Sequence, residues 1–253
     1  MTADIDRIAR FLTSALTAGC LLLPLNAWPA DTTDGRDPAL SLDQAIERYI
    51  RTHPEVIEQS LQALENKRAA DEQQRQKVAI AGHQQELLND QDSPVSGNPS
   101  GDVTVIEFFD YRCGYCKRAA SALTQLQQMD SGVRVVYKDF PILGEASELA
   151  AKAALASHRQ GKHRVFHESL LALKDDLTKE QLFRVAQAAG LDLERLDRDM
   201  KSPEWQPIID RNRALAKQLG ISGTPAFIVG NELVPGALDL NMLQDLVAQK
   251  RGR

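Results

Sequence analysis

The chain has 253 residues, of which 43% are apolar and 26% charged, a composition typical of a folded globular protein. A formal net charge of −5 and a sequence pI near 5.6 argue against a nucleic-acid-binding surface. The sequence contains no glycine-rich phosphate loop of the P-loop or dinucleotide-binding type. The length predicts one well-packed core with an additional segment.

Residues 1–30 have the pattern of a secretory signal peptide. Two arginines precede a mostly apolar stretch at 11–25, which is too short for a transmembrane helix. Cleavage is expected after Ala27 or Ala30, and the alternative is an uncleaved N-terminal anchor. A lipoprotein site at Cys20 is disfavoured, because the apolar run continues past it to Leu25. Removal of the signal leaves a mature chain with two cysteines in an oxidising compartment.

Residues 31–92 are predicted to form an N-terminal helical segment. Ser41 is a candidate N-cap, and His53-Pro54 separates two helices. From Glu65 to Gln85 the sequence is charged and rich in glutamine, so it favours a helix but offers little to bury. The apolar side chains at helical spacing all lie before this stretch: Leu42, Ile46, Tyr49, Ile50, Val56, Ile57, Leu61 and Leu64.

An exposed apolar stripe at 41–65 requires a partner. We expect it to form a homodimer or homotrimer, and the alternative is packing back onto the main domain. The polar half that follows is expected to act as a semi-rigid spacer.

A turn-rich stretch from Ser93 to Gly101 marks the boundary of a second region, residues 93–250. Val103–Phe109 is almost continuously apolar, as is typical of a strand buried on both faces. A helix is expected at 117–129 and a second strand at 133–137.

The remainder of this region is mainly helical. An inserted helical block is predicted at about 143–221, followed by a hairpin in which Gly230-Asn231 joins strands at 226–229 and 232–234. A final helix is expected from about 240 to 248. The order strand, helix, strand, helical block, hairpin, helix predicts an α/β protein: a thioredoxin fold with an inserted helical domain, preceded by the N-terminal helical segment.

Cys113-Gly114-Tyr115-Cys116 lies where the first strand meets its helix, the layout of a thioredoxin-like redox motif. A helix N-terminus stabilises a thiolate, so we expect Cys113 to be the nucleophile. Cys116 lies one helical turn further on and would resolve the mixed disulfide. The alternatives are half of a zinc site, which lacks a second pair of ligands, and a purely structural disulfide, which would close only a very short loop.

Four segments of this region are similar to one protein family. The run EFFDYRCGYCK at 107–117 resembles the active-site segment of the DsbA-like proteins of bacterial periplasms. KDFPILG at 138–144, the Phe166-His167 pair and GTPAF at 223–227 match further family positions. The resemblance covers about residues 93–250.

The N-terminal segment extends the resemblance. Tyr49-Ile50 and the run HPEVI at 53–57 are similar to the additional segment of the ScsC-like branch. Members of that branch are associated with copper-stress tolerance, and some of them oligomerise through this segment.

The resemblance implies a periplasmic thiol–disulfide oxidoreductase that acts on unfolded or wrongly disulfide-bonded secreted proteins. It implies no organic cofactor, because the Cys113–Cys116 disulfide carries the electrons, and it implies a membrane thiol–disulfide redox partner. The Gly-Tyr dipeptide and Thr224 before the key proline resemble the disulfide isomerase DsbC, so isomerase and oxidase activities both remain open. The alternative functions are a periplasmic copper-binding dithiol protein, since Cu(I) prefers thiolates, and a non-catalytic chaperone.

Glu107 is the only charged residue in the predicted central strand. Burial would raise the pKa of its carboxyl group, which could then exchange a proton with Cys116. The alternative is a strand-end residue that reaches solvent. Lys138 is a candidate counter-charge, and its alternative is an ordinary solvated lysine.

The resemblance assigns substrate binding to Thr224, Pro225 and Tyr115. It implies a cis Thr224-Pro225 peptide bond, with the Thr224 backbone available to an extended substrate chain; the alternative is an ordinary trans proline. Residues between the cysteines, Tyr115 included, tune the redox potential. His163 and His167 have a spacing that suits a metal ion, but they have no acidic or cysteine partner, which favours helix-surface or cap histidines.

Overall fold

The computed structural model describes residues 41–174 and 177–252. The predicted signal peptide at 1–30, its cleavage sites and Cys20 lie outside the described residues. The chain divides into two compact units, Met1–Ile57 and Glu58–Arg253, and each is described separately below.

The described part of the first unit is helical. Helix α1, Leu42–Thr52, begins with the predicted cap: the Ser41 hydroxyl accepts a hydrogen bond from the Gln44 N–H at 3.3 Å, and the Gln44 side chain accepts one from the Ser41 N–H at 3.0 Å. His53 ends this helix, and α2 (Pro54–Gly82) begins at the predicted break. The large apolar side chains of α1 are exposed: Leu42, Ile46, Tyr49 and Ile50.

The second unit begins within α2. Ile80 near the end of α2 and Leu87 in α3 (Gln84–Leu88) are fully buried, in one cluster with Phe108 of the sheet. The prediction that Glu65 to Gln85 offers little to bury is therefore wrong at its end. Val78, Ala79, Ile80 and Ala81 form one short apolar run at the end of a polar helix. This run is too short to give a helical period, so the sequence did not mark Ile80 as a core residue.

A five-stranded mixed sheet forms the centre of the second unit, in the order β1-β3-β2-β4-β5. β2 pairs in parallel with β3 and antiparallel with β4, and β1 and β5 occupy the edges. The hairpin of β4 and β5 turns at Gly230, as predicted, where φ is +65°. The strands are β1 Val95–Gly97, β2 Val103–Phe109, β3 Val133–Asp139, β4 Ala226–Val229 and β5 Glu232–Pro235.

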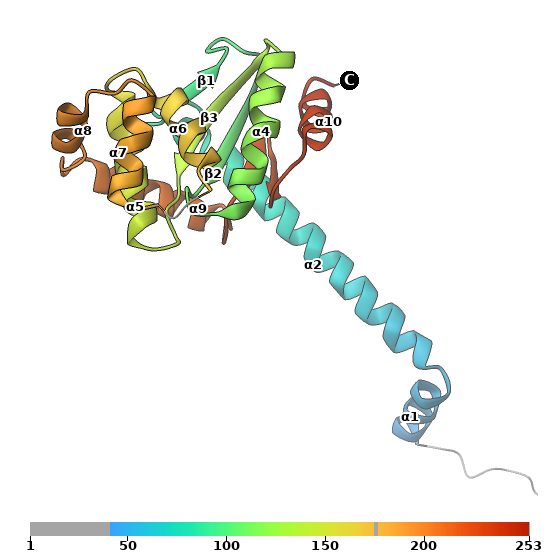
Figure 1. Cartoon of the computed structure of the whole chain (residues 1–253). Helices are drawn as coiled ribbons and strands as arrows, with labels where there is room; N and C mark the ends of the chain where they lie inside the picture. Colours follow the sequence, from blue (N-terminus) through green and yellow to red (C-terminus); the bar gives the residue numbers. More distant parts are fainter. Residues whose placement is uncertain (1–40, 175–176, 253) are drawn as a thin grey trace, which may run out of the picture. The chain divides into compact units, whose positions relative to one another are not determined.

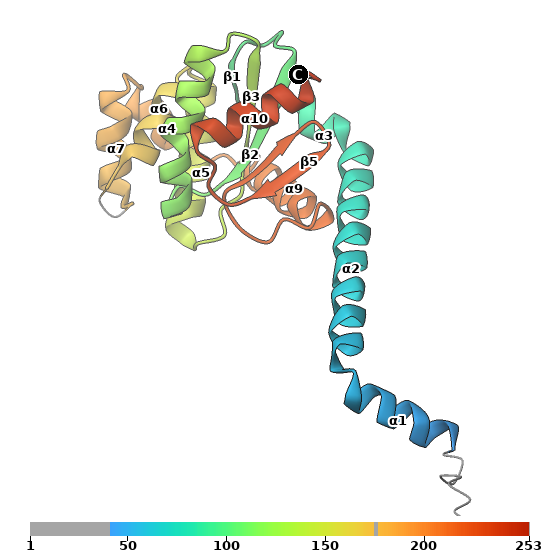
Figure 2. The same ribbon diagram turned by 90° about the vertical axis from the view of Figure 1, so that its right-hand side faces the viewer.

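Helices cover both faces of this sheet (Figure 1). Val105 and Phe109 of β2 face α4 (Gly114–Met129) and α10 (Leu240–Lys250), which lie side by side in Figure 2. Ile106 and Phe108 face the other way, towards α9 (Trp205–Gln218), α3 and the end of α2. The alternation of side chains along β2 therefore supplies two separate cores.

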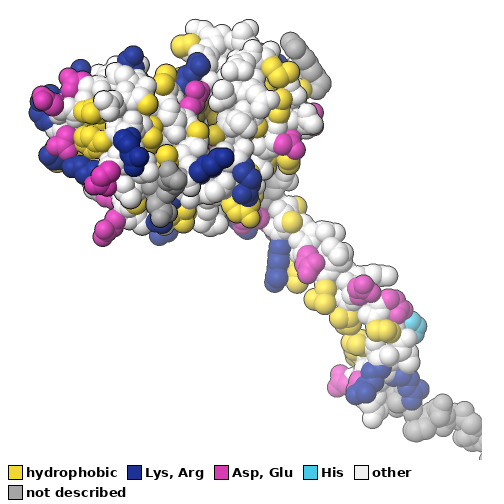
Figure 3. All heavy atoms as spheres, viewed as in Figure 1, with side chains coloured by type: hydrophobic (Ala, Val, Ile, Leu, Met, Phe, Trp, Pro, Cys, Tyr) yellow, Lys and Arg dark blue, Asp and Glu magenta, His cyan; other side chains and the backbone are white. Residues whose placement is uncertain are grey.

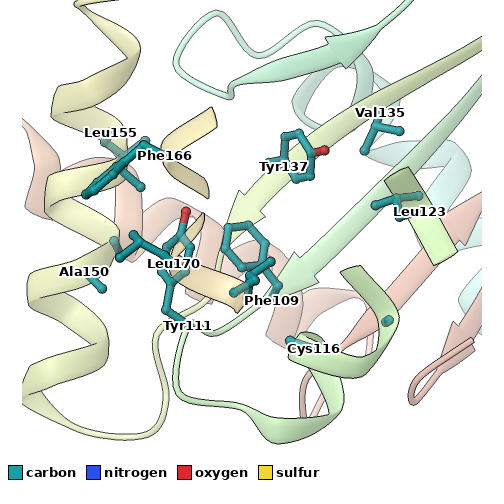
Figure 4. Close-up of a cluster of buried hydrophobic side chains, with 14 of the residues drawn as sticks. Phe109, Tyr111, Cys116, Leu123, Val135, Tyr137, Ala150, Leu155, Phe166 and Leu170 are labelled. Atoms are coloured by element: carbon teal, nitrogen blue, oxygen red, sulfur yellow. The ribbon is translucent and has the colours of Figure 1, made fainter. Parts of the chain in front are cut away.

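The predicted helical insertion is present after β3. Five alanines of α5, at positions 150, 151, 153, 154 and 156, are completely buried, which lets neighbouring helices approach closely. Figure 4 shows Phe166 and Leu170 of α6 beside Leu155 and Ala150 of α5. No helix among the described residues is long and apolar enough to cross a membrane. The insertion comprises α5 Glu145–His158, α6 His163–Ala172, α7 Lys179–Ala188, α8 Leu193–Asp199 and α9 Trp205–Gln218.

Candidate active site

Cys113 lies at the N-cap of α4, directly after the loop that follows β2. Its sulfur accepts a hydrogen bond from the Cys116 N–H at 3.4 Å, and its own N–H donates to the Asp110 carbonyl at 3.0 Å. Both cysteines are free thiols. Cys113 is 6% exposed and Cys116 is fully buried, so an incoming sulfur atom reaches Cys113 first.

The loop before β4 contacts the Cys113 thiol. The Cys113 thiol donates a hydrogen bond to the main-chain carbonyl of Thr224 at 3.2 Å, although the two residues are 111 positions apart. The Thr224-Pro225 peptide bond is cis, which confirms the prediction. The Pro225 carbonyl accepts a hydrogen bond from the Gly236 N–H at 2.8 Å, which ties the loop to the end of β5.

Glu107 is buried beneath the cysteine pair, on the sheet face that α4 covers. Neither carboxylate oxygen has a hydrogen-bond partner among the described residues, and burial raises the pKa of Glu107 to about 8. Burial also raises the pKa of Cys116, and the negative charge of Glu107 raises it further. The alternative of a solvent-exposed strand end is therefore wrong. Burial, together with the opposition between the two negative charges, therefore keeps both groups largely protonated at neutral pH.

Lys138 is neither a counter-charge for Glu107 nor a solvated lysine. Tyr137 is the register partner of Glu107 across β2 and β3, so the next side chain of β3 points to the opposite face. There Lys138 is 1% exposed and its ammonium lies 2.7 Å from Asp90 Oδ2. The prediction failed because sequence position alone did not establish the strand register.

The two histidines of α6 are core residues, so the expectation of surface or cap histidines is wrong. His163 and His167 are almost completely buried, with ring centroids 5.3 Å apart, and the Tyr111 hydroxyl lies 2.9 Å from His167 Nδ1. Burial lowers the pKa of His167 to about 3 and that of His163 well below its usual value. Among residues 41–174 and 177–252, no cluster of three or more His, Cys, Asp or Glu side chains could hold a metal ion.

Asp110 is a site residue that the sequence analysis missed. Its buried carboxylate accepts four hydrogen bonds, which join the loop before Cys113 to the segment after β3. The sequence could have indicated Asp110 as a site residue, because this aspartate directly follows a buried strand and precedes the cysteine motif. Its donors are the N–H groups of Arg112 (2.7 Å), Ile142 (2.8 Å) and Leu143 (3.0 Å) and the hydroxyl of Ser147 (2.7 Å).

Apolar side chains are exposed around the motif. Tyr115 is 59% exposed, and the Arg118 guanidinium lies over its ring at 4.0 Å from the centroid. Ile142 and Leu143 are also exposed, and the Leu143 carbonyl accepts a hydrogen bond from the Arg112 guanidinium. The Cys113 thiol thus lies near exposed apolar groups that can contact an unfolded chain.

A sequence profile of the DSBA-like thioredoxin domain matches residues 104–248. The chain belongs to this family. Its DSBA-like domain includes both cysteines and the Thr224-Pro225 loop.

Three solved structures extend this assignment. A thioredoxin-like oxidoreductase from Silicibacter pomeroyi is 47% identical, with a TM-score of 0.65, and the match covers 67% of this chain and 98% of that one. A linker-deletion mutant of Proteus mirabilis ScsC is 25% identical with a TM-score of 0.70, covering 85% and 99%. The thiol-disulfide exchange protein α-DsbA2 of Wolbachia pipientis is 32% identical with a TM-score of 0.67, covering 70% and 96%. The ScsC-like resemblance is therefore confirmed.

Curated relatives share only a segment with this chain. The Na⁺/H⁺ antiporter NhaA 3 of Salinispora tropica is 31% identical over 155 residues, which is 60% of this chain and 24% of that protein. The chain spans about a quarter of the length of the curated relatives it matches.

Proposed function

We propose that this protein is a periplasmic thiol–disulfide oxidoreductase that exchanges disulfides with secreted polypeptides through Cys113. The observation that carries the proposal is the position of the Cys113 thiol at a helix N-terminus, 3.2 Å from the carbonyl of Thr224 in the cis-proline loop. The Cys113 side chain is slightly exposed, whereas the Cys116 side chain is fully buried. Helix N-termini are positions at which reactive cysteines occur.

In the oxidising direction, a substrate thiolate attacks Cys113 Sγ of the Cys113–Cys116 disulfide. The S–S bond breaks, Cys116 leaves as a thiolate, and Glu107 supplies the proton that neutralises it. A second substrate thiolate then attacks the substrate sulfur of the mixed disulfide and releases Cys113 as a thiolate. Two electrons pass from the substrate dithiol to the protein, and a membrane thiol–disulfide partner returns the dithiol to its disulfide form. No organic cofactor takes part in this cycle.

Thr224, Pro225 and Tyr115 are assigned to substrate binding. A substrate sulfur bonded to Cys113 would bring its own backbone next to the carbonyl of Thr224, where main-chain hydrogen bonds can form independently of the substrate sequence. The exposed ring of Tyr115 offers apolar contact beside the same sulfur. This arrangement suits unfolded or wrongly disulfide-bonded secreted proteins.

Isomerase and oxidase activities require opposite resting states. An isomerase rests in the reduced state, and its Cys113 thiolate attacks wrong disulfides of the substrate. An oxidase rests in the disulfide state, and a substrate thiolate attacks its Cys113–Cys116 bond. We propose that self-association through residues 41–65 favours isomerisation, because it places several dithiols around one substrate. The apolar side chains of α1 and of the first turns of α2 are exposed in the single chain, as Figure 3 shows, and they provide the surface for a homodimer or homotrimer.

Refolding of ribonuclease tests the function and its direction. Recovery of activity from scrambled ribonuclease reports isomerisation, and recovery from reduced ribonuclease reports oxidation. Cys113→Ala should abolish both, and Cys116→Ser should accumulate a mixed disulfide with the substrate. Retention of full activity by Cys113→Ala would contradict the proposal and would instead favour a chaperone.

Copper binding by the dithiol is the second candidate. Soft thiolates bind Cu(I), and two free cysteines one helical turn apart could supply them. Copper binding requires Cys116 to lose its proton, and burial opposes this loss because it raises the pKa of the thiol. Disulfide exchange is therefore the better supported of the two functions. Anaerobic Cu(I) titration of reduced wild type against Cys113→Ser decides this point: tight binding without turnover of scrambled ribonuclease would overturn the proposal.

A further inference from the structure

A groove of about 380 Å³ lies beside the cis-proline loop, and part of its wall comes from outside the DSBA-like domain. Residues 220–226 form one side of it, and Leu233 and Gly236 at the end of β5 contribute another. Gln76 of α2 also lines the groove, although residue 76 precedes the first residue of the family match at 104. Helix α2 therefore adds a surface that the DSBA-like domain alone does not have.

This groove shares a residue with the candidate active site. Thr224 lines the groove and also accepts the hydrogen bond from the Cys113 thiol. A polypeptide joined to Cys113 by a disulfide would lie next to Thr224. One of the two peptide segments that flank the substrate cysteine could therefore enter the groove. The groove has open space beside two of its glycines, since a Cβ atom built on Gly223 or Gly236 would meet no atom within 4 Å.

Gln76 presents an unused amide to this groove. Its side chain has no hydrogen-bond partner among the described residues, and it is only partly exposed. A Cβ atom built on Gly220 would lie 3.7 Å from Gln76 Nε2 and 3.9 Å from Glu72 Oε1, which locates both side chains over the start of the loop. An amide both donates and accepts, so it matches the N–H and C=O groups of an extended chain.

We propose that Gln76 binds the substrate polypeptide, so that α2 forms one wall of the substrate groove beside the cis-proline loop. The inference rests on the proposed function and identifies its substrate more closely: an extended segment flanking the attacked cysteine, held by main-chain hydrogen bonds to Gln76. In this chain α2 is thus a part of the substrate site as well as a connection to α1.

Charge substitution at Gln76 provides the test. Dithiol peptides with acidic or with basic residues beside the reacting cysteine are oxidised by the full chain in excess glutathione disulfide, which regenerates the Cys113–Cys116 disulfide. Each rate is normalised to the rate at which the reduced variant cleaves a small aromatic disulfide. Gln76→Lys should lower KM for the acidic peptide and raise it for the basic one, and Gln76→Glu should do the reverse. Gln76→Ala should raise KM for both by about three- to tenfold, the loss expected for one hydrogen bond.

Gln74 supplies the matched control, since it is an exposed glutamine on the same helix and does not line the groove. Gln74→Lys should leave the KM values of both peptides unchanged. KM values with Gln76→Lys that equal those of wild type for both peptides, or the same shift with Gln74→Lys, would overturn the inference. Failure of the proposed function would look different, because wild type would then show no turnover that depends on Cys113.

Discussion

The ammonium group of Lys138 donates a hydrogen bond to Asp90 Oδ2 at 2.7 Å, on the sheet face opposite Glu107. Asp90 also accepts a hydrogen bond from the Ser93 hydroxyl at 2.7 Å. Burial lowers the pKa of Lys138. Burial of Asp90 acts to raise its pKa, but the hydrogen bond and charge of Lys138 outweigh this effect and the net shift is downward. The pair joins the segment between α3 and β1 to the end of β3.

Removal of the two partners should have unequal effects, because the lysine side chain is 1% exposed and the aspartate 18%. Asp90→Asn leaves a buried ammonium group without its anion and should lower the free energy of unfolding by about 3 kcal/mol. Lys138→Met removes the buried charge and leaves a carboxylate that water can reach, so it should cost clearly less. Urea unfolding of both variants and of the double variant measures this difference. A larger loss for Lys138→Met than for Asp90→Asn would contradict this explanation.

Glu107 should make the reduced protein less stable as the pH rises. Burial raises its pKa from 4.5 to about 8, so the folded state binds more protons than the unfolded state between these values. Its contribution to stability is present below about pH 4.5 and is lost as the pH rises through about 8, a change on the order of 5 kcal/mol. Glu107→Gln should flatten this part of the curve of unfolding free energy against pH.

The control for this prediction is Glu65→Gln, since Glu65 is an exposed carboxylate on α2. It should leave the pH dependence unchanged. A wild-type curve that rises between pH 5 and 8 and is unaffected by Glu107→Gln would show that the carboxyl group is not held protonated.

The histidine pair should act in the acid range with the opposite sign. Burial lowers the pKa of His167 to about 3 and that of His163 well below 6.5, so the unfolded state binds the additional protons. Their contribution is present above about pH 6.5 and is lost as the pH falls towards about 3, roughly 3 kcal/mol for one histidine at about pH 4. His163→Phe should reduce the acid loss of stability, whereas His53→Gln at the C-cap of α1 should not. Thermal unfolding between pH 4 and 7 measures how stability falls with pH. A fall that is the same in His163→Phe as in wild type would contradict this assignment.

Disruption of the apolar stripe should change both the mass in solution and the reaction direction. Ile46 and Leu61 are exposed, and we expect glutamate at both positions to convert an oligomer to a monomer. The ratio of scrambled to reduced ribonuclease refolding should then fall. Sedimentation measures the mass, and the exposed polar Gln62→Glu provides the control. Wild type that is already monomeric would refute self-association through 41–65.

Point substitutions are preferable to a truncation in this experiment. A chain that begins near Gln91 would lack Ile80 and Leu87, which are fully buried against the sheet. Loss of those side chains would lower stability for reasons unrelated to oligomerisation.

The sequence alone determined the order of the elements, the class of fold and the position of the reactive pair. These features follow from local patterns: an apolar run at Val103–Phe109, the Cys113–Cys116 spacing at a strand–helix junction, and the two-residue turn at Gly230. Each pattern depends only on residues that are close together in the sequence, so it can be recognised without knowledge of distant contacts. The cis bond before Pro225 was predicted from the family resemblance and is present.

Only the tertiary structure decided which side chains meet. Lys138 and Glu107 lie on adjacent parallel strands, but their register places them on opposite faces, and Asp90 and Gln76 reach the sheet from segments that precede it. The histidines of α6 have the same spacing whether they face solvent or the core, and packing against Tyr137 and Phe109 placed them inside. Contacts between residues far apart in the chain depend on register and on helix placement, which local patterns do not encode.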